Sequence, residues 1–152
     1  RSVKFPKLSI TWQDINKYRD IKPANEHKAR FRKRVFSQLE EHIAKLVDGL
    51  EDDVEMSMTF TNLDLAGDVK FMVNGGQRMR VVESLYWPKM RFTVRVSQNG
   101  TVVLDKDVEL KDMMFMDRSL PRFHRNDFLR YEKRMLDEWF KNELHALLQT
   151  LR

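Results

Sequence analysis

Four histidines are the side chains best suited to catalysis or metal binding in this sequence, because imidazole ligates metals and exchanges protons near neutral pH. None of them belongs to a His-Glu-x-x-His pair. The sequence also contains no nucleophile elbow, no phosphate-binding glycine loop followed by lysine, and no dinucleotide fingerprint. No catalytic residue, cofactor or metal ligand is therefore predicted, although a site assembled across the fold stays open. The four are His27, His42, His124 and His145.

The segment from Asp64 to Arg80 offers the candidates for contacting a ligand. Asp64 and Asp68 could coordinate a cation, and the backbone amides of residues 74–76 could surround an anion. Tight turns also require Asp, Asn and Gly. A loop of this length is nevertheless long, and long loops often bind ligands or partners. The predicted binding residues are Asp64, Asp68, Asn74, Gly75, Gly76, Arg78, Arg80, Tyr86 and Trp87.

Two further segments have both a structural and a functional interpretation. Residues 28–34 carry five cations, which favours either a solvated helix face or binding to nucleic acid or another anionic surface. The spacing puts Phe31 and Val35 beside an apolar stripe, so the solvated face is preferred. The "MMFM" segment at 113–116 suits an irregular core gap or an adaptable partner surface, and the core is preferred.

Alternating apolar and polar residues predict the strands that must position these side chains. Leu8, Ile10 and Trp12 alternate with Ser9 and Thr11, which indicates a first strand ending near Trp12. A second alternation runs over 54–61 and continues into "NLDLAG". A short strand is expected at 78–82, and a longer one at 90–97 after the Trp87-Pro88 pair.

A hairpin is expected between residues 90–97 and the strand that follows it. A two-residue Asn99-Gly100 turn would put Asp105 opposite Val94, so we expect a three-residue loop over 98–100 instead. Lys106 would then face the apolar side, which predicts a bulge or an edge position there. The expected pairs are Val96–Val102, Val94–Leu104, Lys89–Glu109, Arg91–Asp107 and Thr93–Asp105.

Two amphipathic helices complete the expected fold. The first is capped by Asn25 and runs to about Val47, and the second runs from near Asp127 to Leu151. We predict a single α+β domain over 1–152: a two-layer sandwich with both helices on one face of a mostly antiparallel sheet of four to five strands. The other face should meet water through Glu55, Thr59, Arg91, Arg95, Asp105 and Asp107.

Composition excludes several classes of protein. The 28 basic and 23 acidic residues give a mixed surface of net charge +5 rather than a polycation. The chain has no cysteine, so disulfides, thiolate nucleophiles and cysteine zinc sites are excluded. No stretch approaches the roughly 18 apolar residues of a membrane-spanning helix. The first residue is Arg1, which fits either a cleaved signal peptide or a trimmed chain.

The segments "NLDLAGDV", "RVVESLYWPKMRF", "ELKDMMFMDR" and "RYEKRMLDEWF" occur in a characteristic order. In these the chain resembles a bacterial domain-of-unknown-function family, number 3016, from about Ser9 to about Phe140. Members of that family look like exported proteins with a cleaved signal, so the resemblance implies a periplasmic or secreted location. It implies no activity and no catalytic residues.

These observations favour an exported, non-enzymatic binding or interaction module whose partner is a protein or small ligand of the cell envelope. One alternative binds nucleic acid or an anionic surface through the basic helix. Sheet-based RNA readers expose aromatic side chains, whereas Phe60 and Phe92 are expected to point inward. Another alternative is an enzyme with scattered residues, for instance His124 with Asp117 or Asp127. A homo-oligomer stays open.

Overall fold

A computed structural model of the chain describes residues 1–15, 18, 28–66, 68–71, 78–81, 87–113, 115 and 127–150. Five strands form one open sheet in the order β1-β2-β3-β6-β7. They are β1 (Ser2–Phe5), β2 (Leu8–Trp12), β3 (Val54–Asp64), β6 (Lys89–Gln98) and β7 (Thr101–Lys111). β2 and β3 run parallel, and the other neighbouring pairs run antiparallel.

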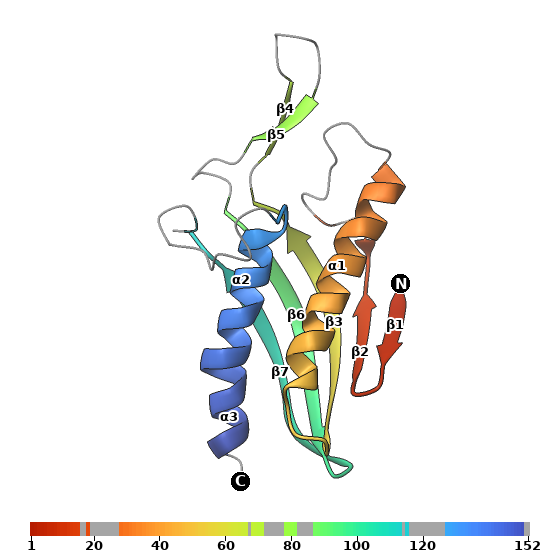
Figure 1. Ribbon diagram of the computed structural model, residues 1–152, viewed down its shortest axis with the longest axis vertical. Coiled ribbons are helices and arrows are strands. Elements are labelled where there is room, and N and C mark those ends of the chain that lie inside the picture. Colours follow the sequence, from red (N-terminus) through yellow and green to blue (C-terminus); the bar gives the residue numbers. More distant parts are fainter. Residues whose placement is uncertain are drawn as a thin grey trace.

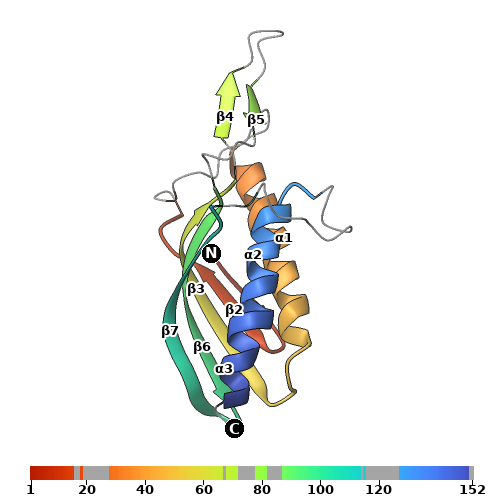
Figure 2. The same cartoon turned by 90° about the vertical axis from the view of Figure 1, so that its left-hand side faces the viewer.

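The helices make the second layer. α1 (Lys28–Asp48) connects the parallel strands β2 and β3, as a parallel pair requires a crossover connection. α2 (Arg130–Glu138), the π-helix η4 (Trp139–Leu144) and α3 (His145–Thr150) follow one another as one C-terminal rod. Both rods lie on the same face of the curved sheet (Figures 1 and 2). This confirms the predicted α+β arrangement of two helices on one face of a mostly antiparallel sheet.

The core lies between these layers, on the sheet face that the alternation predicts. Phe92 and Val94 are fully buried, as are Val35, Leu39 and Ile43 of α1. Among the described residues, no helix is long and apolar enough to cross a membrane.

Six aromatic side chains form a continuous series of ring contacts through the core, here called the aromatic run. It connects α1, three strands and η4, with centroid separations of 4.5, 4.2, 5.0, 5.1 and 5.1 Å along the series. Aromatic pairs in this range stabilise a fold beyond the area they bury. The run consists, in order, of Phe36, Trp12, Phe60, Phe92, Trp139 and Phe140.

Tyr18 packs edge-on against Phe36 at this end of the core, and its hydroxyl donates a hydrogen bond of 2.9 Å to the Phe60 carbonyl oxygen. Burial raises the pKa of Tyr18 to about 12, and the Asp14 carboxylate adds to the rise. The folded state therefore keeps the phenol neutral at a pH where an unfolded tyrosine, with a pKa near 10, has lost its proton.

We expect the free energy of unfolding to fall as pH rises from about 10 to about 12, because only the unfolded state releases the Tyr18 proton in that window. Below pH 10 both states hold the proton, and the contribution is constant. Urea denaturation of wild type and Tyr18→Phe across this range measures the effect. The variant should show a shallower decline, since lysines and other tyrosines titrate in both proteins. Parallel declines would contradict the assignment.

The β6–β7 hairpin differs from the predicted register. Asn99 and Gly100 have φ of 52° and 80°, so both central residues of the turn are left-handed. This makes the turn a two-residue one, the type for which Asn-Gly is favoured. The register shifts next to the turn: Ser97 pairs with Val102, but Val96 pairs with Leu104. The bulge at Val103 puts Asp105 and Asp107 back on the solvent-facing side of the sheet. The predicted three-residue loop is therefore wrong.

Every predicted pair across this hairpin is therefore displaced. The observed pairs replace Val96–Val102, Val94–Leu104, Lys89–Glu109, Arg91–Asp107 and Thr93–Asp105 by Val96–Leu104, Val94–Lys106, Lys89–Lys111, Arg91–Glu109 and Thr93–Asp107. Val102, the expected partner of Val96, is 51% exposed, whereas Val96 is fully buried. Lys106 is exposed on the edge strand, as predicted.

Three elements were not foreseen from the sequence. β1 forms an antiparallel hairpin with β2, so the first predicted strand lies inside the sheet. β4 (Asp68–Phe71) lies where a loop was expected and pairs with β5 (Arg78–Val81) in a separate two-stranded sheet (Figure 1), whereas β5 itself confirms the short strand predicted at 78–82. The C-terminal rod contains the π-helical turn η4. The predicted cap of α1 at Asn25 lies outside the described residues.

Candidate functional site

The sheet face opposite the helices, here called the open face, is polar on all five strands. No described helix covers it (Figure 2). The exposed residues predicted from the alternation lie there, including Arg91, Arg95, Asp105 and Asp107. The strands at its centre contribute hydroxyl side chains. The open face includes Ser2, Lys4, Ser9, Thr11, Glu55, Ser57, Thr59, Arg91, Thr93, Arg95, Ser97, Asp105, Asp107 and Glu109, and the exposed Val102 pairs with Ser97 at its border.

Strand register aligns these residues in rows that cross the sheet. One row runs Lys4, Ser9, Ser57, Arg95, Asp105 through four successive strand pairs. Neighbouring strands lie about 4.8 Å apart, so Lys4 and Arg95 begin about 14 Å from each other. Two short serines between two long cations leave the middle of the row low. The register thus produces a trough on the open face.

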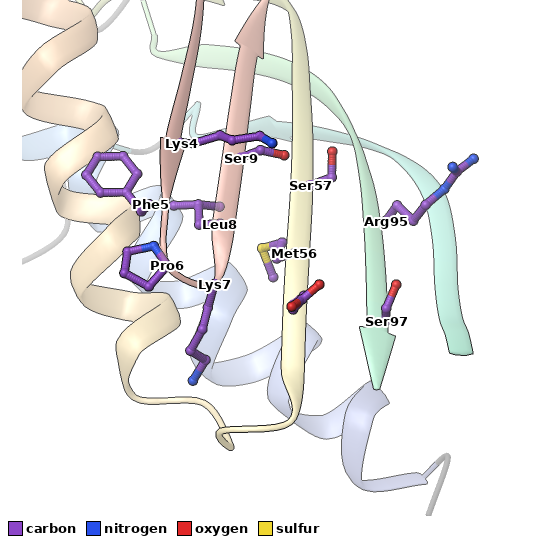
Figure 3. A pocket seen from close by; sticks show the side chains of 11 residues that line it. Lys4, Phe5, Pro6, Lys7, Leu8, Ser9, Met56, Ser57, Arg95 and Ser97 are labelled. Atoms are coloured by element: carbon purple, nitrogen blue, oxygen red, sulfur yellow. The ribbon is translucent and has the colours of Figure 1, made fainter. Parts of the chain in front are cut away.

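A shallow depression of about 340 Å³ lies at this trough, beside the β1–β2 turn (Figure 3). The Lys4 side chain extends across the sheet towards Ser9, whereas Arg95 is directed away towards β7 (Figure 3). The lining comprises Lys4, Phe5, Pro6, Lys7, Leu8, Ser9, Glu55, Met56, Ser57, Arg95 and Ser97.

Ion pairs hold the arginines of the open face. The Arg95 guanidinium donates to Asp105 Oδ2 from Nη2 at 3.0 Å and from Nε at 3.2 Å. Arg91 Nη2 donates to Glu109 Oε2 at 3.0 Å. All four side chains are about half exposed, so each pair stabilises the fold by no more than about 1 kcal/mol. Their effect is to orient both arginines towards the acidic edge strand.

The binding residues predicted from the sequence are only partly described. Asp64 ends β3 and is paired in register with Lys89, and Trp87 is half-buried just before β6. Asp68, Arg78 and Arg80 lie on the β4–β5 hairpin, which brings Asp68 opposite Val81 and Arg80 opposite Val69. The other predicted residues, Asn74, Gly75, Gly76 and Tyr86, lie outside the described residues.

The basic segment forms the first two turns of α1. Phe31 and Val35 are buried, and Arg30, Lys33 and Arg34 are exposed, as the spacing predicts. The Arg34 guanidinium lies over the ring of Phe128, 4.7 Å from its centroid. Phe128, near the start of the predicted second amphipathic helix, is 39% exposed.

A buried polar cluster near the start of α2 was not identified from the sequence. Arg134 Nη2 donates to Asp112 Oδ2 at 2.9 Å and to the Phe115 carbonyl oxygen at 2.8 Å. Glu132, only 1% exposed, accepts a hydrogen bond of 3.0 Å from the Ala66 backbone amide. The predicted core role of the methionine-rich segment holds for Phe115, which is fully buried, but Met113 is 55% exposed. Met114 and Met116 lie outside the described residues.

A third buried carboxylate, that of Glu40, fixes the N-terminal hairpin to α1. Glu40, 3% exposed, accepts hydrogen bonds of 2.8 Å from Trp12 Nε1 and of 2.7 Å and 3.0 Å from the Arg1 guanidinium. Hydrogen bonding to Glu40 raises the pKa of Arg1. The buried Glu40 carboxylate is therefore paired with a positive charge, and Arg1 and Trp12 replace the hydrogen bonds that water would otherwise donate to it.

The described histidines do not converge on a common site. His42 Nε2 lies 2.6 Å from Asp137 Oδ1 between α1 and α2, and His145 lies 3.1 Å from the Gln149 side-chain nitrogen. His27 and His124, with Asp117, lie outside the described residues. Within the described residues, no group of three or more His, Asp or Glu side chains is placed to hold a metal ion.

Lys4, Ser9 and Ser57 line the depression, but they were not grouped as a site from the sequence. The alternation of β2 and β3 does put Ser9 and Ser57 on the polar side. The alternation does not show which strands are neighbours. A parallel β2–β3 pair connected through α1 has no tight turn that the sequence could reveal.

Comparison with known proteins gives one match. A family model described as a protein of unknown function, DUF3016, covers residues 6–142. No curated protein and no solved structure matches the chain.

Proposed function

The chain belongs to the DUF3016 family of proteins of unknown function, and we propose that it is a non-enzymatic binding module of the bacterial cell envelope that holds its ligand on the open face. The envelope location follows from the exported character that the family resemblance implies. One observation supports the ligand surface: the row Lys4, Ser9, Ser57, Arg95, which meets a depression on a sheet face that no described helix covers.

The chemistry of this face suits a polar ligand. Serine and threonine hydroxyls both donate and accept hydrogen bonds, and lysine and arginine donate only. Rigid strands set the spacing of these groups, which lowers the entropic cost of binding compared with a mobile loop. The inner aromatic residues cannot take part, since Phe60 and Phe92 are fully buried. Phe60 and Phe92 therefore cannot provide the base stacking that sheet-based RNA readers use.

A bulky substitution on the open face tests the proposal. Ser57 is exposed and lines the depression, so the indole of Ser57→Trp should occupy much of it, and an exposed strand position tolerates an aromatic residue. Immobilised wild-type protein should enrich a ligand from a periplasmic extract but not from a cytosolic extract. We expect Ser57→Trp to reduce that enrichment at least about tenfold, as identified and quantified by mass spectrometry.

Glu143→Trp is the matched control, because Glu143 is exposed on η4 in the opposite layer. It adds the same indole and should capture as wild type does. Thermal unfolding followed by circular dichroism verifies that both variants are folded. Equal capture by all three proteins would refute a ligand surface on the open face, and enrichment from the cytosolic extract alone would refute the envelope assignment.

A further inference from the structure

Three hydrogen-bond donors gather at one end of the depression. Lys4 pairs in register with Ser9, and Ser9 pairs with Ser57, so the three residues occupy adjacent positions on β1, β2 and β3. Their side chains lie on the open face, and the Lys4 side chain extends towards the serines (Figure 3). An ammonium group and two hydroxyl groups therefore face a common space about two strand spacings wide.

The electrostatics of the lining favour a negative ligand. Its charged residues are Lys4, Lys7 and Arg95 against Glu55, three cations and one carboxylate, so the net charge is +2. Two of these cations are directed elsewhere: Lys7 Nζ donates to the Leu50 carbonyl oxygen at 2.8 Å, and Arg95 pairs with Asp105. Among the described residues, no carboxylate forms an ion pair with Lys4. Lys4 is thus the cation available to a ligand.

Glu55 sets the direction in which the ligand lies. It precedes Ser57 by two residues on β3, about 7 Å along the strand, and it pairs in register with Ser97. A carboxylate repels an anion but accepts hydrogen bonds from hydroxyl groups. The negative group belongs at the Lys4 end of the depression, and a hydroxylated portion of the ligand belongs beside Glu55 and Ser97.

We infer that Lys4, Ser9 and Ser57 form a binding site for an oxyanion, a phosphate or carboxylate group carried by a hydroxylated molecule. The inference rests on the proposed function and deepens it, since it names the ligand chemistry of the open face. Phosphate and carboxylate oxygens offer several lone pairs, and charge-assisted hydrogen bonds from an ammonium are stronger than neutral ones. Acidic saccharides and lipid headgroups both present this chemistry in an envelope.

Amide chemical shifts in ¹H–¹⁵N spectra of the full chain test the site, with four soluble probes: inorganic phosphate, glycerol 3-phosphate, glucuronate and neutral glucose. We expect saturable shifts at Ser9 and Ser57 with the three anions and weaker ones with glucose. Lys4→Glu should weaken phosphate binding about tenfold or more. Lys141→Glu, which makes the same charge change on exposed η4, should alter it less than about twofold.

Absence of saturable shifts at Ser9 and Ser57, or an equal loss in both charge variants, would overturn the oxyanion site. The two proposals fail separately. If Ser57→Trp abolishes capture from the extract but phosphate causes no saturable shifts, the open face is supported as a ligand surface and the oxyanion site is rejected. If phosphate binding depends on Lys4 but Ser57→Trp captures the ligand as wild type does, the oxyanion site is supported and the proposed function is rejected. Two measurements distinguish a lipid headgroup from an acidic saccharide as the natural ligand. Sedimentation with vesicles containing phosphatidylglycerol would indicate the lipid, and a higher affinity for glucuronate without sedimentation would indicate the saccharide.

Discussion

Replacing Arg134 with methionine is expected to lower the free energy of unfolding by about 3–5 kcal/mol, the usual cost of leaving a buried charge without its partner. The side chains of Arg134 and Asp112 are 4% and 8% exposed, and their atoms are 2.9 Å apart. Methionine fills much of the same volume but donates no hydrogen bond. The Asp112 carboxylate and the Phe115 carbonyl oxygen would both lose the Nη2 donor. Urea denaturation followed by circular dichroism measures the change.

Two further variants separate burial of charge from loss of a salt bridge. Arg91→Met removes the exposed pair with Glu109 and should cost no more than about 1 kcal/mol. Combining Asp112→Leu with Arg134→Met removes both charges, and it should be less destabilising than Arg134→Met alone. If Arg134→Met lowers the free energy of unfolding as little as Arg91→Met does, water reaches Asp112 and the Arg134–Asp112 pair contributes only as a surface pair does.

Trp12→Ala should destabilise the protein by about 3–5 kcal/mol, the range for truncating a large aromatic side chain in a core. Trp12 is 2% exposed and stacks on Phe36 at 4.5 Å and on Phe60 at 4.2 Å. Its removal therefore interrupts the aromatic run where α1 meets β3. It also deletes the 2.8 Å hydrogen bond from Nε1 to Glu40. Denaturation by urea, with the intrinsic fluorescence of the remaining tryptophans as a second probe, measures the loss.

Trp12→Phe divides this loss between packing and hydrogen bonding. It keeps a ring in the stack but leaves Glu40 without the indole donor, which should cost about 1–3 kcal/mol. Phe128→Ala serves as the control for an aromatic side chain outside the run, since Phe128 is 39% exposed. A Phe128→Ala loss as large as that of Trp12→Ala would indicate that the aromatic run has no special weight in stability.

Alternation predicted the parts of this fold in which one face of each strand is buried. Phe92 and Val94 are buried and Arg95 is exposed because a shift of one residue would reverse every side chain at once. The apolar spacing of α1 and of the C-terminal rod was equally decisive. What periodicity cannot supply is the neighbour of each strand, and the predicted sheet therefore lacked both β1 and the parallel β2–β3 pair.

Local irregularities account for the remaining differences. One extra residue at Val103 lets an Asn-Gly turn coexist with an acidic outer side, and a pattern that assumes uniform pairing cannot include it. The π-helical turn η4 likewise adds a residue to the helical repeat. Asp112 and Arg134 were overlooked because charged residues are seldom buried, and sequence gives no sign that two distant ones will meet. The depression depends on the missed strand order, so its residues could not be grouped in advance.

The outermost strand of the sheet carries a lysine on its inner side, with consequences for self-association. A second chain adding a strand beside β7 would enclose the ammonium of Lys106 between two apolar layers, away from water. On the open face of β7, Asp105, Asp107 and Glu109 would lie opposite the same acidic residues of an identical chain, and the like charges would repel. Pairing of identical chains along this edge, the route to fibrils, is therefore opposed on both faces of the sheet.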